Sequence, residues 1–422
     1  MAKDLERDLG LFAVLAISIG AMVGSGIFIL PALAMDMAGP AVVLAYLLAG
    51  VLVLPAALSK SEMATAMPEA GGTYVYIERS MGPLLGTIAG LGTWFALSFK
   101  GALALVGGAP YLAIYLDVPI TPLALTLAVV LILVNLVGAK QTGRLQIGIV
   151  AVMLVAMVWF VVGSTGATDP VRFEGLFDAG TGGLLAATGF VFVSYAGVTK
   201  VASVAEEIEN PSRNIPLGML GSLGFTTVLY VLVVAVMVGA APTPNLAGSA
   251  TPIYDVARAT LSAPGTWAIV LAAVLALVST ANAGLLSSSR YPFAMSRDNL
   301  MPSVFEQVSD RFKTPSTAIT VTGAILLVMI AFVPIEDIAK LGSAFQILVF
   351  VLINLALVAF RESAAKDYDP DFRDPFYPWT QAVGVIGGLV LLTQMGFEPL
   401  AGAVLIVVAS VVWYFAWARK RV

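Results

Sequence analysis

The sequence predicts an all-α membrane protein in which two of the membrane helices are discontinuous. Of the 422 residues, 59% are hydrophobic and only 11% are charged, whereas a soluble domain carries about 25% charged residues. Apolar runs close to the roughly 20-residue length that spans a bilayer recur along the whole chain. Two of these runs are interrupted by segments that contain glycine, Gly24-Ser25-Gly26 and Ser194-Tyr195-Ala196-Gly197.

Twelve apolar runs are predicted to be the membrane helices, with no stretch left for a separate soluble domain. The first run, near 10–34, contains the first interruption, and the sixth, near 183–208, contains the second. The runs between them lie near 41–66, 84–116, 121–140 and 144–165, and those that follow lie near 215–240, 266–291, 316–334, 338–361, 382–396 and 399–418. Within the loop 241–265, residues 253–258 can form a short amphipathic helix or a simple surface connector.

The positions of Lys and Arg predict a multi-pass protein of the plasma membrane with both termini in the cytoplasm. In that orientation the outward-facing loops contain only Arg172, Arg258 and Lys340, and the other loop Lys and Arg residues face the cytoplasm. One missed helix would destroy this separation, so the orientation supports the helix count. Two lysines, Lys100 and Lys200, fall inside membrane runs.

The composition excludes several kinds of chemistry. The chain has no cysteine and no histidine, which excludes disulfides, thiolate nucleophiles, Cys/His metal sites and imidazole proton relays. The net charge of −4 is spread along the loops and does not indicate a nucleic-acid partner. We expect a protein that is not an enzyme and has no catalytic residues, no metal site and no cofactor, with the lipid bilayer and a small molecule as its partners.

The two interruptions predict a binding site. Backbone groups freed in lipid cost several kcal/mol each unless protein, water or a ligand satisfies them. The N–H groups of Gly24, Ser25 and Gly26, with the half-helix from Ile27, suit a carboxylate. Carbonyls around Phe192 and Val193 would accept hydrogen bonds from an ammonium. Together the interruptions predict a site for the backbone of an α-amino acid, and two matched breaks are typical of an inverted-repeat transporter.

The alternative is that these glycines only let helices pack closely, as small residues often do in membranes. We prefer that interpretation for the glycines of the third run, Gly90, Gly92, Gly107 and Gly108.

Four motifs, in this order, resemble those of the amino acid-polyamine-organocation (APC) permeases. They are Gly-Ser-Gly-Ile-Phe at 24–28, Pro-Glu-Ala-Gly-Gly-Thr-Tyr at 68–74, Glu-Glu-Ile-Glu-Asn-Pro-Ser-Arg-Asn-Ile-Pro at 206–216 and Ser-Arg-Asp-Asn-Leu-Met-Pro at 296–302. The resemblance implies a leucine-transporter-type fold, a 5+5 inverted repeat with discontinuous helices 1 and 6 and twelve transmembrane helices. It would divide the chain into a first repeat at 1–165, a second at 183–361 and two accessory helices at 382–418.

The resemblance also implies which residues surround the substrate. It places Met22, Val193, Val198 and Gly284 around the substrate side chain, with Tyr195 and Phe192 as gates, although Phe192 could equally be ordinary packing surface. None of these residues is a carboxylate, which a cationic side chain would need, so neutral amino acids are predicted. The full predicted site consists of Met22, Gly24, Ser25, Gly26, Ile27, Phe192, Val193, Tyr195, Ala196, Val198 and Gly284.

The coupling ion is left open between a proton, which we favour, and sodium. Some relatives carry a lysine in the fifth helix that replaces a coupling sodium ion, but Met153 occupies that position here. Intramembrane lysines mark function by default. Lys200 is the preferred candidate because it lies beside the second interruption, and Lys100 is the second candidate. Lys200 could instead be a structural tether to backbone carbonyls, and Lys100 could make only packing contacts. A sodium site in this fold would use carbonyls of the first run and hydroxyls of the eighth run, where Ser279, Thr280 and Asn282 offer oxygens.

Proton-coupled symport, sodium-coupled symport and amino acid or polyamine exchange all fit these residues. A non-transporting membrane sensor is the alternative of another class, and a channel is disfavoured because no helix carries repeated charged residues. The carboxylates Glu206, Glu207 and Glu209, near Arg213, could form an inner gate or be purely structural.

Overall fold

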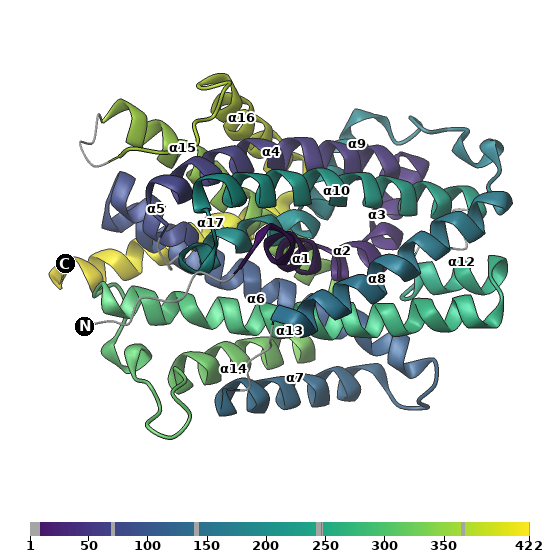
Figure 1. Cartoon of the computed structure of the whole chain (residues 1–422), viewed down its shortest axis with the longest axis horizontal. Coiled ribbons are helices and arrows are strands. Elements are labelled where there is room, and N and C mark those ends of the chain that lie inside the picture. Colours follow the sequence, from purple (N-terminus) through teal and green to yellow (C-terminus); the bar gives the residue numbers. More distant parts are fainter. Residues whose placement is uncertain are drawn as a thin grey trace.

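The computed structural model describes residues 9–68, 72–138, 143–241, 246, 248–363 and 368–421. Within these residues the chain is helical, and the one β-bridge joins Leu9 to Ile208. Most of the long helices run along the long axis of the molecule, while α1 crosses them and is seen nearly end-on (Figure 1). The predicted motif residues 69–71 and the end of the run near 121–140 lie outside the described residues.

The first half of the chain contains the first interrupted helix and four long helices. The interrupted helix comprises α1 (Leu11–Met22), α2 (Ser25–Phe28) and α3 (Leu30–Ala38). After it come α4 (Val42–Ala66), α5 (Gly72–Met81), α6 (Pro83–Ala113), α7 (Ile120–Val137) and α8 (Gly143–Ser164). The helix α5 was not predicted, because its sequence is a polar motif between two apolar runs.

The second half begins with the second interrupted helix. It comprises α9 (Gly180–Val191), which continues directly into the 3₁₀ helix η4 (Phe192–Glu207). The remaining helices are α10 (Pro211–Ala240), α12 (Pro252–Thr260), α13 (Ala263–Arg297), α14 (Ser316–Phe332), α15 (Ile335–Glu362), α16 (Trp379–Gln394) and α17 (Phe397–Ala416). The short helix α12 confirms the amphipathic helix predicted over 253–258, because its Ile253, Val256 and Ala257 are buried and Arg258 is exposed.

Apolar length identifies the helices that can cross a bilayer. In the described residues, nine helical segments are long and apolar enough to do so, and three shorter apolar helices accompany them, namely Leu11–Met22, Ser316–Phe332 and Trp379–Gln394. The most apolar stretch of α6 is 89% buried, whereas that of Phe397–Lys420 is 17% buried. A multi-pass helical membrane protein with α6 at its centre and α17 facing lipid follows.

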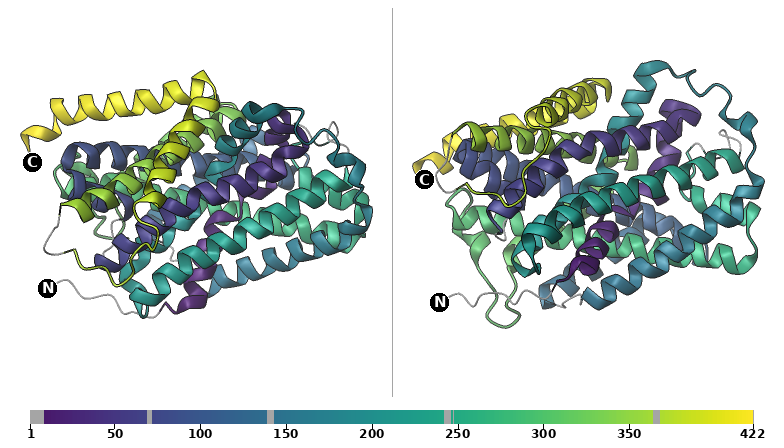
Figure 2. Two further views of the ribbon diagram at one scale, coloured as in Figure 1. Left: turned by 90° about the horizontal axis from the view of Figure 1, so that it is seen from above. Right: turned by 45° about the horizontal axis from the view of Figure 1, so that its top comes forward.

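The helices form two groups that meet along the interrupted helices. In one group α1, α4, η4 and α10 pack on one another, and in the other α6, α7, α13 and α14 do. The helix α15 contacts both α4 and α6 and therefore joins the groups. The last two helices, α16 and α17, lie on one flank of the bundle (Figure 2).

Candidate functional site

The first interruption is a two-residue break followed by a single helical turn. Val23 is extended (φ −77°, ψ 101°) and Gly24 is non-helical (φ −170°, ψ −117°). The helix resumes at Ser25, not at Ile27 as predicted, because the N–H groups of Ile27 and Phe28 both reach the carbonyl of Gly24 at 3.2 Å. The N–H groups of Gly24, Ser25 and Gly26 precede this turn or begin it, so helix geometry provides no intrahelical acceptor for them.

The carbonyls at the break are satisfied by side chains from three other helices. The Lys100 Nζ donates to the Ala21 carbonyl at 2.8 Å, and the Tyr230 hydroxyl donates to the Met22 carbonyl at 2.8 Å. Two further carbonyls accept from tyrosine hydroxyls, that of Gly26 from Tyr46 at 2.5 Å and that of Phe28 from Tyr111 at 2.8 Å. The acceptors that the break frees are therefore already used by the protein.

Three buried tyrosines form a cluster against this break. The ring centroids of Tyr46 and Tyr230 are 5.4 Å apart and those of Tyr195 and Tyr230 are 5.3 Å apart, both edge to face. The Tyr195 hydroxyl donates to the Tyr46 carbonyl at 2.8 Å. The cluster connects α4 and α10 to η4 and holds all three around the break.

The second interruption is a change of helix type rather than an unwound segment. The chain narrows from α to 3₁₀ helix at Phe192, and within η4 only Val204 leaves helical dihedral angles. The Ser343 hydroxyl donates to the Phe190 carbonyl at 2.6 Å and accepts from the Val193 N–H at 3.2 Å. The chain thus stays helical around Phe192 and Val193, where the sequence predicts an unwound segment with carbonyls free to bind an ammonium.

Glycines let the two interrupted helices cross in close contact. A Cβ on Gly197 would overlap the backbone of Ala21 and Met22, and a Cβ on Gly26 would lie 2.7 Å from the Ser194 Cβ and 2.8 Å from the Tyr230 hydroxyl. Both glycines therefore have a packing role, whatever their backbone groups bind. Close packing also accounts for Gly107, where a Cβ would overlap the side chain of Ile29.

A cavity of about 700 Å³ extends from the break along α13. Ala21, Ala196, Gly197, Thr280 and Gly284 line its inner end, and Arg290, Arg297, Lys313 and Pro315 line the remainder. Thr280 and Arg297 are separated by roughly 25 Å along a helix that rises about 1.5 Å per residue. We call the part between the break and Arg290 the inner cavity.

Two buried hydroxyls at the break lack a hydrogen-bond partner within the described part of the chain. They are Ser25 Oγ and Thr280 Oγ1. Thr280 lines the cavity, and its hydroxyl faces Gly24 so closely that a Cβ there would overlap it. At the break, therefore, hydroxyl and backbone N–H donors lie beside carbonyls that already accept hydrogen bonds from other side chains.

These features agree with the comparison to known proteins. A family model described as amino acid permease matches residues 13–417. The chain belongs to the amino acid permease family. The resemblance of its motifs to the APC permeases is thereby confirmed.

Relatives of this permease differ in their named substrates. It is 28% identical to the branched-chain amino acid permease BcaP of Bacillus subtilis over 443 residues, which cover 99% of this chain and 94% of that protein. It is 27% identical to the methylthioribose transporter of Bacillus subtilis over 448 residues, with 100% and 95% covered. It is 29% identical to cationic amino acid transporter 3, mitochondrial, of Arabidopsis thaliana over 397 residues, with 87% and 64% covered.

The structure separates the predicted site residues into two sets. Ala196, Gly284, Lys100 and Lys200 line the cavity. The others are buried around the two interruptions and do not line it, namely Met22, Gly24, Ser25, Gly26, Ile27, Phe192, Val193, Tyr195 and Val198. Phe192 packs edge to face on Phe350, with ring centroids 5.5 Å apart, which matches its alternative interpretation as packing surface.

Two of the three side-chain oxygens predicted for sodium are already engaged by neighbouring helices. The Ser279 hydroxyl donates to Gln146 Oε1 at 3.0 Å, and Asn282 Oδ1 accepts from Asn135 Nδ2 at 2.6 Å. Between them in the sequence, Thr280 points to the break instead. Consecutive residues of α13 point in different directions around the helix axis, so Ser279, Thr280 and Asn282 do not meet at one site. Their closeness in the sequence does not show this.

Lysine placement differs from the order of preference that the sequence suggested. Lys100 is 4% exposed and contacts the break directly, whereas Lys200 is half-buried in the cavity wall. A third lysine, Lys60 of α4, is 1% exposed and donates to Thr73 Oγ1 at 2.7 Å and to the Thr199 carbonyl at 3.1 Å. Lys60 lies inside the predicted run 41–66, and that position is the sequence signal that identifies it as a third intramembrane lysine.

The motif 206–216 is held by backbone contacts. The Leu9 N–H donates to the Glu207 carbonyl and the Glu209 N–H donates to the Leu9 carbonyl, both at 3.0 Å. The Asn214 amide donates to the Glu209 carbonyl at 2.5 Å. The start of the described chain is thereby tied to the end of η4, and the predicted role of the Glu206, Glu207 and Glu209 carboxylates as an inner gate stays a prediction.

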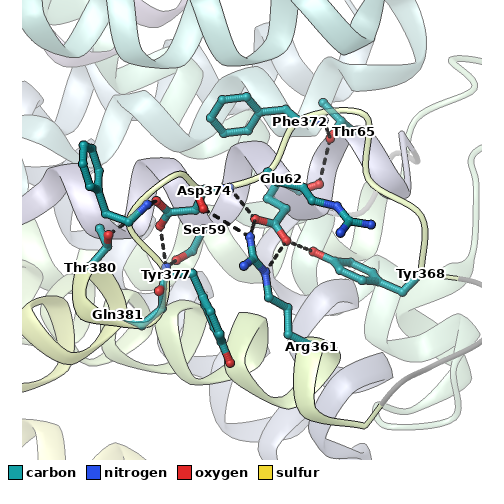
Figure 3. A network of polar contacts seen from close by, with 12 residues as sticks. Ser59, Glu62, Thr65, Arg361, Tyr368, Phe372, Asp374, Tyr377, Thr380 and Gln381 are labelled. Atoms are coloured by element: carbon teal, nitrogen blue, oxygen red, sulfur yellow. Dashed lines mark hydrogen bonds and ion pairs between the residues drawn. The ribbon is translucent and has the colours of Figure 1, made fainter.

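A second buried polar region joins the ends of α4 and α15 to the loop before α16. The fully buried Glu62 carboxylate accepts from Arg361 Nε at 2.8 Å and Nη2 at 2.5 Å, from the Tyr368 hydroxyl at 3.1 Å and from the Asp374 N–H at 2.7 Å. Gln381 bonds both Asp374 and Ser59, and Figure 3 shows these side chains converging from three segments. We call this set the Glu62 network. Burial and the Glu62 carboxylate raise the pKa of Tyr368.

Proposed function

We propose that this permease is a secondary active transporter that carries neutral amino acids across the plasma membrane. The observation that carries the proposal is the polarity of the α1 break. Its carbonyls accept hydrogen bonds from Lys100, Tyr230, Tyr46 and Tyr111, whereas the hydroxyls of Ser25 and Thr280 lack partners among the described residues. A site with its acceptors occupied and its donors available suits a carboxylate.

The walls of the inner cavity favour a neutral side chain. Ala21, Ala196, Gly197 and Gly284 offer small apolar surface, and Lys100 and Lys200 stand in the same wall. A cationic substrate would have to bury its charge beside two ammonium groups, which costs several kcal/mol. The relative named for branched-chain amino acids makes leucine, isoleucine and valine the first substrates to test.

The architecture that best supports this function is the twelve-helix, 5+5 inverted repeat. In that arrangement residues 1–165 and 183–361 are the repeats, and 382–418 form the two accessory helices. The cavity lining includes the exposed Arg297 and Lys313, and basic residues favour the cytoplasmic side. The structure would then correspond to an inward-facing state with both termini in the cytoplasm.

We further propose that Lys100 couples transport to protons. Its ammonium occupies the Ala21 carbonyl, at the end of α1, where a cation is stabilised by the helix dipole. Loss of the proton would weaken this contact and free the end of α1 to move against η4. Lys200, which the sequence favours for coupling, lines the cavity wall. It would contact the substrate on its way through the cavity instead.

Sodium coupling is less favoured, because neighbouring helices already bond Ser279 and Asn282. Of the predicted side-chain oxygens, that leaves only Thr280 Oγ1 without a partner among the described residues.

Uptake by purified protein in liposomes tests the proposal. We expect labelled leucine to accumulate under an inward proton gradient, to be displaced by unlabelled isoleucine or valine, and not to be displaced by arginine. Protein-free liposomes and a protonophore serve as controls. Uptake that requires internal amino acid would identify an exchanger, uptake that follows a sodium gradient would identify a sodium symporter, and binding without uptake would identify a sensor. Stronger competition by arginine than by leucine or alanine would refute the neutral substrate class.

A further inference from the structure

The cavity wall is unevenly charged. Its lining contains six basic residues, Arg79, Lys100, Lys200, Arg290, Arg297 and Lys313, and two acidic ones, Glu78 and Asp298. The two acids lie together, since the carboxylate of Asp298, after burial, is the main cause that raises the pKa of Glu78. Asp298 also accepts a hydrogen bond from the Tyr74 hydroxyl at 2.7 Å. The negative charge is therefore gathered where α5 meets the end of α13.

The positive charge extends further inward, away from these acids. Lys200 lies close enough to both Lys100 and Arg290 to interact electrostatically with each. Among the described residues, none of the salt bridges involves any of these three cations. Lys100 is buried, Lys200 is half-buried and Arg290 is exposed at the cavity surface. Charges that are removed from water are normally paired, and the two acids of the lining, Glu78 and Asp298, form no salt bridge with these three cations among the described residues. The imbalance favours an anion as the partner of this part of the cavity.

The helices place suitable hydrogen-bond donors around this point. Along α13 the residues Thr280, Gly284, Ser287 and Arg290 recur at helical spacing on the cavity side. Ser287 and Arg290 are one turn apart, and Lys200 of η4 lines the same cavity and interacts electrostatically with Arg290. A hydroxyl, a guanidinium and an ammonium are the groups that hold small anions in proteins.

We propose that the inner cavity binds a small monovalent anion between Lys200 of η4 and Ser287 and Arg290 of α13. The bound anion would carry one negative charge and would be small enough to contact these few donors directly. The anion can be the carboxylate of the transported solute as the solute leaves the protein, an assignment that rests on the proposed function. It can also be a free anion such as chloride.

Thermal unfolding of the purified permease in detergent, followed by tryptophan fluorescence, tests the site. Chloride is titrated at constant ionic strength, with a large organic sulfonate as the replacing anion. We expect a saturable rise in the melting temperature. In Lys200→Met and in Arg290→Gln, the chloride concentration at half-saturation should rise about tenfold or more, because one charge-assisted hydrogen bond is lost.

The exposed Arg311 provides the matched control, because it carries the same charge but does not line the cavity. Arg311→Gln should titrate like the unaltered protein. An absent or non-saturable shift, or a shift that both cavity variants retain in full, would overturn the proposal. Because Arg290 is exposed at the cavity surface, its variant keeps the test valid even if Lys200→Met does not fold.

The source of the anion is identified by competition at the same site. If leucine shifts the chloride titration and leucinamide, which lacks the carboxylate, does not, the solute carboxylate shares the site. If chloride binds and neither compound competes, the site serves a free anion. Transport assays remain independent of this result, since anion binding without leucine uptake would refute the transport proposal and leave the anion site intact.

Discussion

The Glu62 network and the inner cavity bury charge in opposite ways. In the Glu62 network the carboxylate receives four hydrogen bonds, two of them from Arg361. In the inner cavity Lys100, Lys200 and Arg290 lie near one another, and the described residues offer them no salt bridge. The Glu62 network lies between α4, α15 and the loop before α16, whereas the inner cavity is lined by α1, α6, η4 and α13.

The difference indicates which region is structural and which is built for a ligand. A buried charge with all its partners present fixes neighbouring segments, and removing one partner is costly because the other remains. A buried charge without a partner is already unfavourable in the empty protein. We therefore expect stability to depend strongly on the Glu62 network and weakly on the cavity lysines, and transport to depend on them in the reverse order.

The largest effect on stability should follow the loss of the Glu62 carboxylate. Glu62→Gln leaves Arg361 and the Asp374 N–H without their charged acceptor, which for a buried pair costs about 3–5 kcal/mol. Thermal unfolding in detergent would measure the loss.

The neighbouring Glu362 offers the control. It is exposed and accepts one hydrogen bond, from the Tyr377 hydroxyl at 2.7 Å, so Glu362→Gln should change stability by less than about 1 kcal/mol. The double variant Glu62→Gln with Arg361→Gln should recover part of the loss. Equal melting temperatures for Glu62→Gln and Glu362→Gln would show that the network is not structural.

The sequence predicts features of these two regions that depend on neighbouring residues, and it does not predict contacts between residues far apart in the chain. The apolar runs, the α1 break and the short helix α12 were predicted, because bilayer length, glycine and helical periodicity are local properties. The pairing of Glu62 with Arg361 was not predicted, since the residues are 299 positions apart and no local pattern links them. The tyrosine donors to the break were missed for the same reason. A tyrosine in an apolar run looks alike whether it faces lipid or a freed carbonyl.

The site was predicted less completely than the fold. The glycine signal located the α1 break to within two residues, but it did not reveal that helix six would tighten into a 3₁₀ helix instead of opening. The sequence also favours Lys200 over Lys100, because Lys200 is closer along the chain to a predicted interruption and a sequence contains no distances in space. Lys100 and the Ala21 carbonyl that it contacts are 79 residues apart in sequence.

The second largest effect should come from Gly197, where the two interrupted helices cross. Gly197→Ala places a Cβ against the Ala21 and Met22 backbone, which cannot rotate away as a side chain would. We expect at least the about 1–3 kcal/mol typical of overpacking, together with loss of transport. Gly224→Ala in α10 is the control, because a Cβ there has open space. A stable and active Gly197→Ala protein would contradict the close crossing.

The tyrosine donors should have smaller and similar effects. Tyr230→Phe leaves the Met22 carbonyl without its donor, and Tyr111→Phe does the same at Phe28. Each loss should cost about 1–3 kcal/mol, the range for an unsatisfied buried acceptor. Tyr414→Phe, on the helix that faces lipid, should be nearly neutral. If the phenylalanine variants at 111 and 230 unfold at the temperature of the unaltered protein, the hydroxyls do not hold the break.

The smallest effect on stability, and the largest on coupling, should follow the replacement of Lys100. Lys100→Met removes a donor from the Ala21 carbonyl but also removes a buried charge, and these opposed contributions should leave stability within about 1 kcal/mol. Proton-driven leucine uptake should be lost, while exchange of internal for external leucine persists. Lys100→Arg should bind substrate but turn over poorly, because a guanidinium does not release its proton near neutral pH. Lys200→Met is the matched variant in the same wall, and it should retain proton dependence. Proton-driven uptake that survives Lys100→Met but not Lys200→Met would transfer the coupling role to Lys200, and survival in both would exclude the lysines.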